Sequence, residues 1–207
     1  MRGMVSFICV MLLLTAVGCK RKVQVTVPDD APFRNGDIVF RRGYGAQSRA
    51  VANASRSVWS HTGVLVRDTV ADIWTVVHAV PGEAPQGEPD YVKQEPLKVF
   101  FGHDRAQAGA WLRVNCTDSM ASRAAEYAIG KAAEHVQFDN DYLLSDTTSL
   151  YCTELVWRSY LSVGIDITDG NRHYVPQMFS ADGEGIYPAD IENSKTTLFI
   201  NIFNNNP

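Results

Sequence analysis

The sequence lacks any run of Lys and Arg that would form a basic patch. Its 19 basic side chains are outnumbered by 23 acidic ones, which gives a formal net charge of −4 at pH 7. Nucleic-acid-binding domains need a positively charged surface to neutralise phosphates. The sequence therefore gives no reason to expect DNA or RNA as a partner.

Cysteine is scarce as well, with four residues in a chain of 207. Cys152, His61 and His78 are conceivable zinc ligands, but they lack the short paired spacing of structural zinc sites. The acidic segment 138–142 lacks the glycine and the closing glutamate of an EF-hand calcium loop. We therefore expect no metal ion and no other cofactor.

The N-terminal segment has the pattern of a targeting signal. Arg2 precedes an apolar stretch at 4–17 that is too short to span a bilayer comfortably, and small residues then lead to Cys19. Residues 1–19 resemble a bacterial lipoprotein signal, in which Cys19 becomes the lipidated first residue of the mature protein. Ala16 replaces the usual leucine of that motif, so an ordinary secretory signal is the alternative.

Beyond the signal we expect a single folded domain. The chain has 45% hydrophobic and 20% charged residues and is long enough to bury one core. Residues 20–31 are expected to form a tether, with a short strand at 23–27, and residues 32–207 to form the domain. The signal predicts a cell-envelope location, with the domain lipid-anchored on the periplasmic face of a bacterial membrane.

The location limits what the cysteines can do. Cys9 lies in the signal and Cys19 is the lipidation site, which leaves Cys116 and Cys152 in the domain. In an oxidising compartment two remaining thiols can pair. A Cys116–Cys152 disulfide is therefore the structural alternative to any role of Cys152 as a nucleophile.

Cys152 stands at the start of a predicted helix. Apolar residues recur at helical spacing through Tyr160, and polar residues precede the cysteine. The positive end of a helix dipole and its exposed N–H groups stabilise a thiolate, and the same groups could receive the charge of an acyl-transfer intermediate. A buried structural thiol is the alternative interpretation.

Two histidines flank a predicted β-hairpin. The apolar, β-branched runs 64–66 and 73–77 are separated by a polar segment, as in two antiparallel strands. His61 precedes the first strand and His78 follows the second, so pairing brings both to one end of the ribbon. This placement is compatible with a general base and its orienting partner.

The remaining elements follow from local periodicity and turn signals. The clearest is a helix at Asp118–Glu134 with alanines along one side and Asp118 as its N-cap. The Pro- and Gly-rich segment 81–89 is expected to form a loop that walls a cleft. A weak helix is expected at 47–58, and strands at 37–40, 91–101, 110–114 and 197–203.

Four short blocks together resemble a known family. Three of them resemble, in order, the blocks that follow the nucleophile in NlpC/P60 cell-wall peptidases: GDIVF at 36–40, SHTGV at 60–64 and VHA at 77–79. In those enzymes the cysteine block comes first, whereas here YCTELV at 151–156 comes last. This order is similar to the circularly permuted papain-like group, which includes the YiiX/YaeF-like proteins and, more distantly, lecithin:retinol acyltransferases. The resemblance covers residues 32–167 and implies an α+β fold, an antiparallel sheet packed against the cysteine helix.

The resemblance also assigns roles. Cys152 matches the nucleophile, His61 the general base and His78 the polar residue that orients His61. Many YiiX-like members have glutamate at the position of His78, so the third role is variable. In NlpC/P60 enzymes a tyrosine upstream of the cysteine helps to bind the oxyanion, and its counterpart here is either Tyr142 or Phe138, the second of which lacks a hydroxyl.

The function implied is thiol-based hydrolysis of an amide bond through a thioacyl-enzyme. An envelope lipoprotein with these blocks points to peptidoglycan stem peptides or a related peptide or amide, and Glu83 or Glu154 could bind a substrate amine. Lipid amide or ester cleavage, or acyl transfer, is a second possibility. A binding lipoprotein that keeps the cleft without turnover is a third.

Overall fold

The computed structural model describes residues 24–175 and 183–203. The expected signal at 1–19, its lipidation site Cys19 and the start of the expected tether lie outside the described residues. Within the described ranges, no helix combines the length and the apolar character that crossing a bilayer requires.

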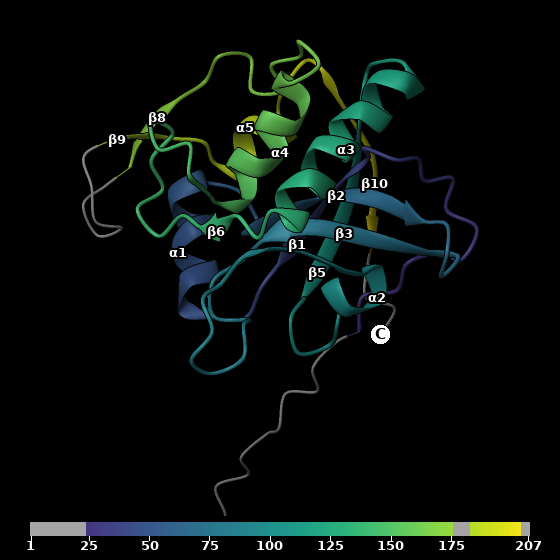
Figure 1. Cartoon of the computed structure of the whole chain (residues 1–207), viewed down its shortest axis with the longest axis horizontal. Coiled ribbons are helices and arrows are strands. Elements are labelled where there is room, and N and C mark those ends of the chain that lie inside the picture. The colour runs from purple at the N-terminus through teal and green to yellow at the C-terminus, as the bar shows by residue number, and fades with distance from the viewer. Residues whose placement is uncertain (1–23, 176–182, 204–207) are drawn as a thin grey trace, which may run out of the picture.

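One six-stranded sheet forms the centre of the molecule (Figure 1). Its strands run in the order β10-β5-β1-β2-β3-β4, and every neighbouring pair is antiparallel. The expected hairpin is present as β2 and β3. The strands are β1 (Ile38–Arg42), β2 (His61–Asp68), β3 (Ile73–Ala79), β4 (Val92–Pro96), β5 (Ala108–Val114) and β10 (Thr197–Phe203).

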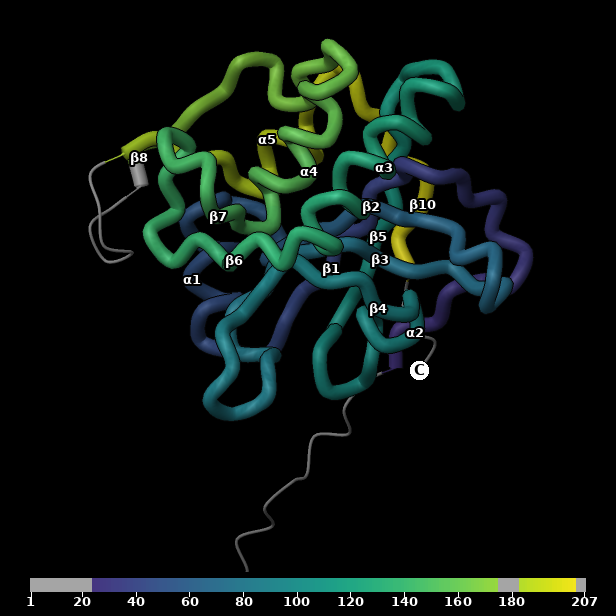
Figure 2. Tube along the Cα trace, viewed as in Figure 1, coloured from purple at the N-terminus to yellow at the C-terminus, as the bar shows by residue number. Residues whose placement is uncertain are grey.

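The helices and short strands complete the domain. The helices are α1 (Ala46–Ser55), α2 (Leu97–Phe100), α3 (Asp118–Ala133), α4 (Cys152–Leu161) and α5 (Pro188–Glu192). Two parallel short strands, β6 (Gln137–Phe138) and β7 (Ser149–Leu150), lead into α4, as the tube in Figure 2 shows. A further small pair is formed by β8 (His173–Val175) and β9 (Gly183–Gly185).

Strand alternation divides the core into two apolar clusters. Ile38 and Phe40 of β1 belong to the cluster that α3 and α4 cover, whereas Val39 between them belongs to the opposite one. Successive side chains of a strand point to opposite faces, so β1 serves both clusters. The second cluster includes Phe100 of α2 and Val25 of the N-terminal segment. The predicted α+β class, with an antiparallel sheet packed against the cysteine helix, is confirmed.

Three local expectations are wrong. Residues 24–27 form no strand, and Val25 instead packs into the second cluster. The strand expected at 91–101 ends at Pro96, which caps α2 instead of continuing the ladder because proline cannot donate a backbone hydrogen bond. The N-cap of α3 is Thr117, whose hydroxyl accepts from the N–H of Met120, and Asp118 is the first residue inside the helix.

The cysteine helix is fixed to the sheet by its far end. The hydroxyl of Tyr160, on the last turn of α4, donates to the carbonyl oxygen of Gly36 in the turn before β1. Gly36 has a positive φ of 88°, and a side chain there would collide with the carbonyl oxygen of Ala121 in α3. Only glycine meets both conditions, so this turn sets the distance between both helices and β1.

Candidate active site

The hairpin brings the two histidines into direct contact. Val64 of β2 pairs with Val77 of β3, and His61 and His78 lie near the same end of this ladder. Nε2 of His61 is 2.8 Å from Nδ1 of His78, and both rings are buried. The contact uses Nε2 of His61, so Nδ1 is the ring nitrogen left for a reaction.

An aromatic side chain of α2 holds the pair in place. The ring of Phe100 lies 5.6 Å from the His61 ring and 5.2 Å from the His78 ring, measured between centroids. The guanidinium of Arg41 lies over the same Phe100 ring at 4.7 Å and donates to the Phe100 carbonyl oxygen at 3.0 Å. The imidazoles are therefore packed as tightly as core residues.

Behind His78 lies a carboxylate that the sequence did not reveal. Glu95 projects from β4, the strand paired with β3, and its Oε1 is 3.0 Å from Nε2 of His78. The distance is that of an ion pair or hydrogen bond, although the alignment is poorer than in a good hydrogen bond. His78 thus has a polar neighbour at each ring nitrogen.

Glu95 belongs to a cluster of opposite charges. Nη1 of Arg105 contacts Glu95 at 2.9 Å and Glu83 at 2.9 Å. Nζ of Lys93 lies 2.8 Å from Glu83 and 3.5 Å from Glu95, and Nη2 of Arg41 lies 2.5 Å from Glu83. Three cations therefore surround two carboxylates beside the histidines.

Burial keeps both imidazoles neutral. Burial, aided by the charge of Arg41, lowers the pKa of His61 well below 6.5. Burial lowers the pKa of His78 to about 4, although the hydrogen bond with Glu95 opposes the change. Burial disfavours the charge of Glu95 too, but the contact with His78 and the nearby cations outweigh it and lower the pKa of Glu95 to about 2. At neutral pH the cluster holds an ionised Glu95 beside uncharged rings.

The thiol of Cys152 begins α4, as expected, but it is not a resting thiolate. Burial raises the pKa of Cys152 to about 11, and it outweighs the N–H groups of Thr62 and Thr153 and the charge of Arg41, which lower it. The helix N-terminus was expected to lower this pKa. The N–H groups at the helix start do act in that direction, but the pKa rises overall because the loss of solvent is the larger effect.

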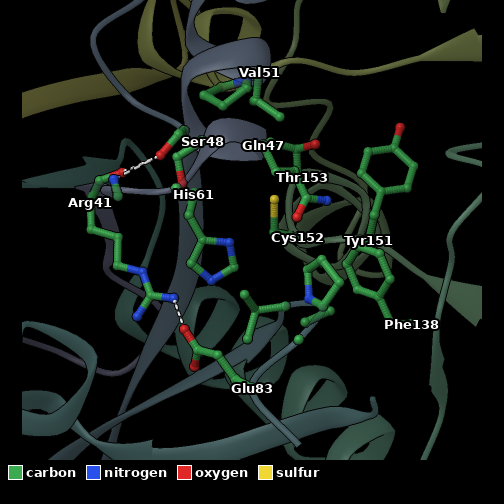
Figure 3. A pocket seen from close by; sticks show the side chains of 18 of the residues that line it. Arg41, Gln47, Ser48, Val51, His61, Glu83, Phe138, Tyr151, Cys152 and Thr153 are labelled. Carbon is green, nitrogen blue, oxygen red and sulfur yellow. Dashed lines mark hydrogen bonds and ion pairs between the residues drawn. The ribbon is translucent and has the colours of Figure 1, made fainter. Parts of the chain in front are cut away.

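Cys152 and His61 face one cavity of about 530 Å³. Figure 3 shows the sulfur and the imidazole pointing into it, with Arg41 and Glu83 on the His61 side and Phe138 and Tyr151 on the other. The loop 81–89 was expected to wall the cleft, and Pro81, Gly82 and Glu83 do line it. The apolar side chains of Val51, Ile186 and Pro188 also line the cavity.

A segment from the C-terminal part closes the cavity beside the cysteine. The hydroxyl of Tyr151 accepts from the N–H of Ile186 at 2.9 Å, and the hydroxyl of Thr153 donates to the Ile186 carbonyl at 2.6 Å. These two residues flank Cys152 in sequence. The wall at 185–188 is therefore anchored to the start of α4.

Of the two further residues predicted for the site, Tyr142 and Glu154, only Tyr142 lies in the cavity. Tyr142 lines the cavity, and its hydroxyl accepts from Nε2 of Gln47 at 2.7 Å. Burial raises the pKa of Tyr142 to about 12, so the hydroxyl stays protonated. Glu154 does not line the cavity. It is buried within the helix packing and paired with Arg158 at 2.7 Å.

The disulfide alternative is wrong, since Cys116 and Cys152 are both free thiols. Cys116 lies beside Arg34. The cavity sulfur is therefore available for chemistry.

Among the described residues, one group of side chains has the spacing of a possible metal site. Ligand atoms of His78, Glu83 and Glu95 lie within 4.8 Å of one another. Cys152 and His61, which the sequence analysis considered as zinc ligands together with His78, do not belong to this group.

Comparison with known proteins agrees with this geometry. The family of permuted papain-like amidases named for YaeF and YiiX, Peptidase C92, matches residues 32–200. The chain belongs to this family. Its nucleophile candidate follows its histidines in sequence, which is the permuted order, and the resemblance inferred from the four blocks is confirmed.

Two proteins illustrate the C92 relationship. The uncharacterized protein YiiX of Escherichia coli K12 is 29% identical over 136 residues, which are 61% of this chain and 57% of the relative. The crystal structure of the metalloprotein YiiX from Escherichia coli O157:H7 superposes with a TM-score of 0.65 at 20% identity. That match covers 81% of this chain and 96% of the other, and it supports the fold.

Proposed function

We propose that this protein is a thiol amidase that cleaves an amide bond through a thioacyl-enzyme. The observation that carries the proposal is the His61–His78 contact at 2.8 Å. It engages Nε2 of His61 and leaves Nδ1 for the sulfur of Cys152, which faces the same cavity. Membership in a family of permuted papain-like amidases supports the reaction class.

The reaction begins with neutral partners. As the sulfur of Cys152 attacks the amide carbon, its proton passes to Nδ1 of His61. The resulting imidazolium protonates the leaving amine, the C–N bond breaks, and a thioester to Cys152 remains. Water then attacks the thioester and gives a proton to His61. The S–C bond breaks, the acid leaves, and the thiol regains its proton.

The oxyanion needs hydrogen-bond donors at the start of α4. Within the part of the chain that the structure describes, no side chain caps this helix, so its first N–H groups are available near Cys152. The protonated hydroxyl of Tyr142 lines the same cavity. We assign the oxyanion site to these groups.

The substrate is proposed to be a peptide or related amide of the bacterial envelope, with the protein attached to the membrane through lipidated Cys19. A free carboxylate in the cavity was expected to bind an amine, yet Glu83 is neutralised by cations and Glu154 lies elsewhere. Asp104 is exposed and lines the cavity, so it is the carboxylate suited to an amine.

A lipid amide or ester is the second candidate substrate. It is favoured by the apolar wall of Val51, Phe138, Tyr151, Ile186 and Pro188, which would suit an acyl chain. The volume of about 530 Å³ admits either a short peptide or part of a chain.

A metal-dependent function does not fit these residues. The YiiX structure is described as that of a metalloprotein, and the corresponding possibility here is the group His78, Glu83 and Glu95. Its two carboxylates already contact Arg41, Lys93 and Arg105. A divalent ion would add positive charge where three cations are already present, so no step is assigned to a metal.

The test is hydrolysis of two substrate sets, stem-peptide amides and N-acyl amines, by the wild type and by Cys152→Ala and His61→Ala. We expect turnover of one set, its loss in Cys152→Ala, and a loss of about 10²–10⁴-fold in His61→Ala. Hydroxylamine should trap the thioester as a hydroxamate. Turnover by Cys152→Ala would contradict the mechanism. Ligand binding without turnover by the wild type would favour the binding-protein alternative.

A further inference from the structure

His78 is held between two partners by its two ring nitrogens, and this sets a constraint on where protons can lie. Nδ1 faces Nε2 of His61 at 2.8 Å, and Nε2 faces Oε1 of Glu95 at 3.0 Å. A neutral imidazole carries one proton, on one nitrogen or the other. The choice made by His78 therefore determines the choice made by His61.

One arrangement places two acceptors against each other. If the proton of His78 were on Nδ1, it would point to a lone pair on Nε2 of His61. The lone pair on Nε2 of His78 would then face the carboxylate of Glu95, with no water-exposed surface at His78 to relieve the repulsion. His61 would carry its own proton on Nδ1, and it could not accept a proton from Cys152.

The other arrangement sets a donor against an acceptor at both contacts. With its proton on Nε2, His78 directs an N–H toward Oε1 of Glu95 at 3.0 Å, although the alignment is poorer than in a good hydrogen bond, and it accepts at Nδ1 from Nε2–H of His61. Nδ1 of His61 is then unprotonated and free to receive the thiol proton. The carboxylate alone distinguishes the two arrangements, since the His61–His78 contact has the same length in both.

The charge of Glu95 is itself secured by its neighbours. Arg105 contacts both carboxylate oxygens, at 2.9 and 3.1 Å, and Lys93 lies 3.5 Å from Oε2. Two cations hold the carboxylate in its ionised form and in one orientation. Lys93 also pairs with His78 across the β3–β4 ladder, so the same two strands position acid and imidazole.

We propose that Glu95 is a positioning residue that fixes the tautomers of both histidines, so that His61 presents an unprotonated Nδ1 to Cys152. The catalytic group thereby becomes a chain of four: Cys152, His61, His78 and Glu95. The inference rests on the proposed function for its kinetic consequence but not for its structural one. The placement of the protons can be measured without a substrate.

The first experiment is ring-nitrogen NMR of the protein labelled with ¹⁵N-histidine, with His61 and His78 assigned through His→Gln variants. In the wild type, both rings should be neutral and protonated on Nε2. Glu95→Ala should move His78 to Nδ1-protonated or mixed forms. In Glu95→Gln the amide oxygen can still accept, so the Nε2–H form of His78 should largely return. Glu88→Gln, an exposed acid in the preceding loop, is the control.

The second experiment measures kinetics of the same variants. Glu95→Ala should lower kcat by about 10–100-fold with little change in KM, and Glu95→Gln should recover part of this loss. A purely structural role would also change the resonances of the exposed His135, which follows α3, and these should stay unchanged.

Two outcomes would overturn the inference: a wild-type His78 protonated on Nδ1, or tautomers that persist in a folded Glu95→Ala. The proposed function fails separately. If Glu95 controls the tautomers but Cys152→Ala retains turnover, the reaction mechanism is wrong and the role of Glu95 stands.

Discussion

At the scale of single residues, the thiol of Cys152 and the two imidazoles are uncharged at neutral pH, although charged groups surround them. The pKa of Cys152 is raised to about 11 and the pKa of His78 is lowered to about 4, both chiefly by burial. A stored thiolate–imidazolium pair is therefore disfavoured, and in the proposed mechanism the thiol would lose its proton during the attack. In that mechanism activation depends on the position of one ring nitrogen of His61, and the contacts with His78 and Phe100 hold the ring in place.

His78→Glu should be more damaging than His78→Gln. Either side chain could accept a hydrogen bond from the His61 ring, but a carboxylate at this position would lie against the ionised Glu95 in a buried site. We expect His78→Gln to retain a measurable fraction of kcat/KM and His78→Glu to lose more. Hydrolysis rates at pH 7 measure the difference, with circular dichroism to verify that both variants fold.

If His78→Glu retained more activity than His78→Gln, Glu95 would not face residue 78 as a carboxylate. The double variant with Glu95→Gln tests this cause directly, since it removes the repulsion. Partial recovery in the double variant relative to His78→Glu alone is the expected coupling.

At the scale of elements, the site depends on how α4 is held against the sheet. The first turn of α4 carries Cys152 and is joined to the wall at Ile186, and the last turn is joined to Gly36 by Tyr160. The helix is thus fixed at both ends. Its position relative to the hairpin determines whether the sulfur meets Nδ1 of His61.

Tyr160→Phe should destabilise the fold by about 1–3 kcal/mol, because it leaves the carbonyl of Gly36 without its donor at a buried site. Urea denaturation monitored by tryptophan fluorescence gives the change in the free energy of unfolding. Tyr127→Phe, at a partly exposed residue of α3 where the new ring can keep its contact with Lys131, is the control and should have little effect. Equal stability of Tyr160→Phe and the wild type would show that the contact contributes nothing.

The elements that sequence could predict are those made by neighbouring residues. The hairpin and the start of α4 follow from runs of apolar residues and their flanking polar segments, so the placement of His61 and His78 could be inferred. Pro96 and Thr117 were misjudged because several nearby residues suit each strand end or cap about equally well. Glu95 carries no local signal, since its role depends on a neighbour one strand away.

The cavity could be predicted only in part, for the same reason. Loop 81–89 has the composition of a loop, but its Glu83 meets Arg41 and Arg105 only through the fold. Glu154 is close to Cys152 in sequence, yet the helix turns its side chain toward Arg158. Proximity along the chain was a poor guide where helical rotation decides direction.

At the scale of the whole molecule, the site lies inside the structure that holds the fold together. His78 has no exposed surface, and its neighbour Glu95 is almost buried. Protonation of these groups in acid therefore acts on folding as well as on the proposed reaction. The folded protein resists taking up a proton at His78, whereas the unfolded chain accepts one at an ordinary pKa.

The stability of the protein should fall as pH decreases from about 6.5 to about 4. Because the pKa of His78 is lowered to about 4 on folding, the unfolded state binds more protons in this window. The stability is complete above the window and is lost below it, by roughly 3 kcal/mol for this group. Urea unfolding at several pH values measures how the free energy of unfolding changes with pH. Between pH 6.5 and 4 this change should be smaller in His78→Gln than in the wild type.

The exposed His103 supplies the matched control. In His103→Gln the free energy of unfolding should depend on pH between 6.5 and 4 as it does in the wild type. If His78→Gln also showed the wild-type dependence, the acid sensitivity would originate in other groups.

Because of the permuted order of the chain, the histidine pair and Cys152 are expected to reach the site at different stages of folding. His61 and His78 are 17 positions apart and meet through a single hairpin, and β-hairpins in general form within about 1–10 μs. Cys152 comes 91 positions after His61 (152 − 61), and it reaches the cavity only when α4 docks on the sheet. Closing so long a segment costs more chain entropy and slows folding. The histidine pair is thus encoded locally, while the sulfur arrives through a contact between distant parts of the chain. If the protein acts as proposed, errors in late folding would abolish the reaction with the histidines already in place.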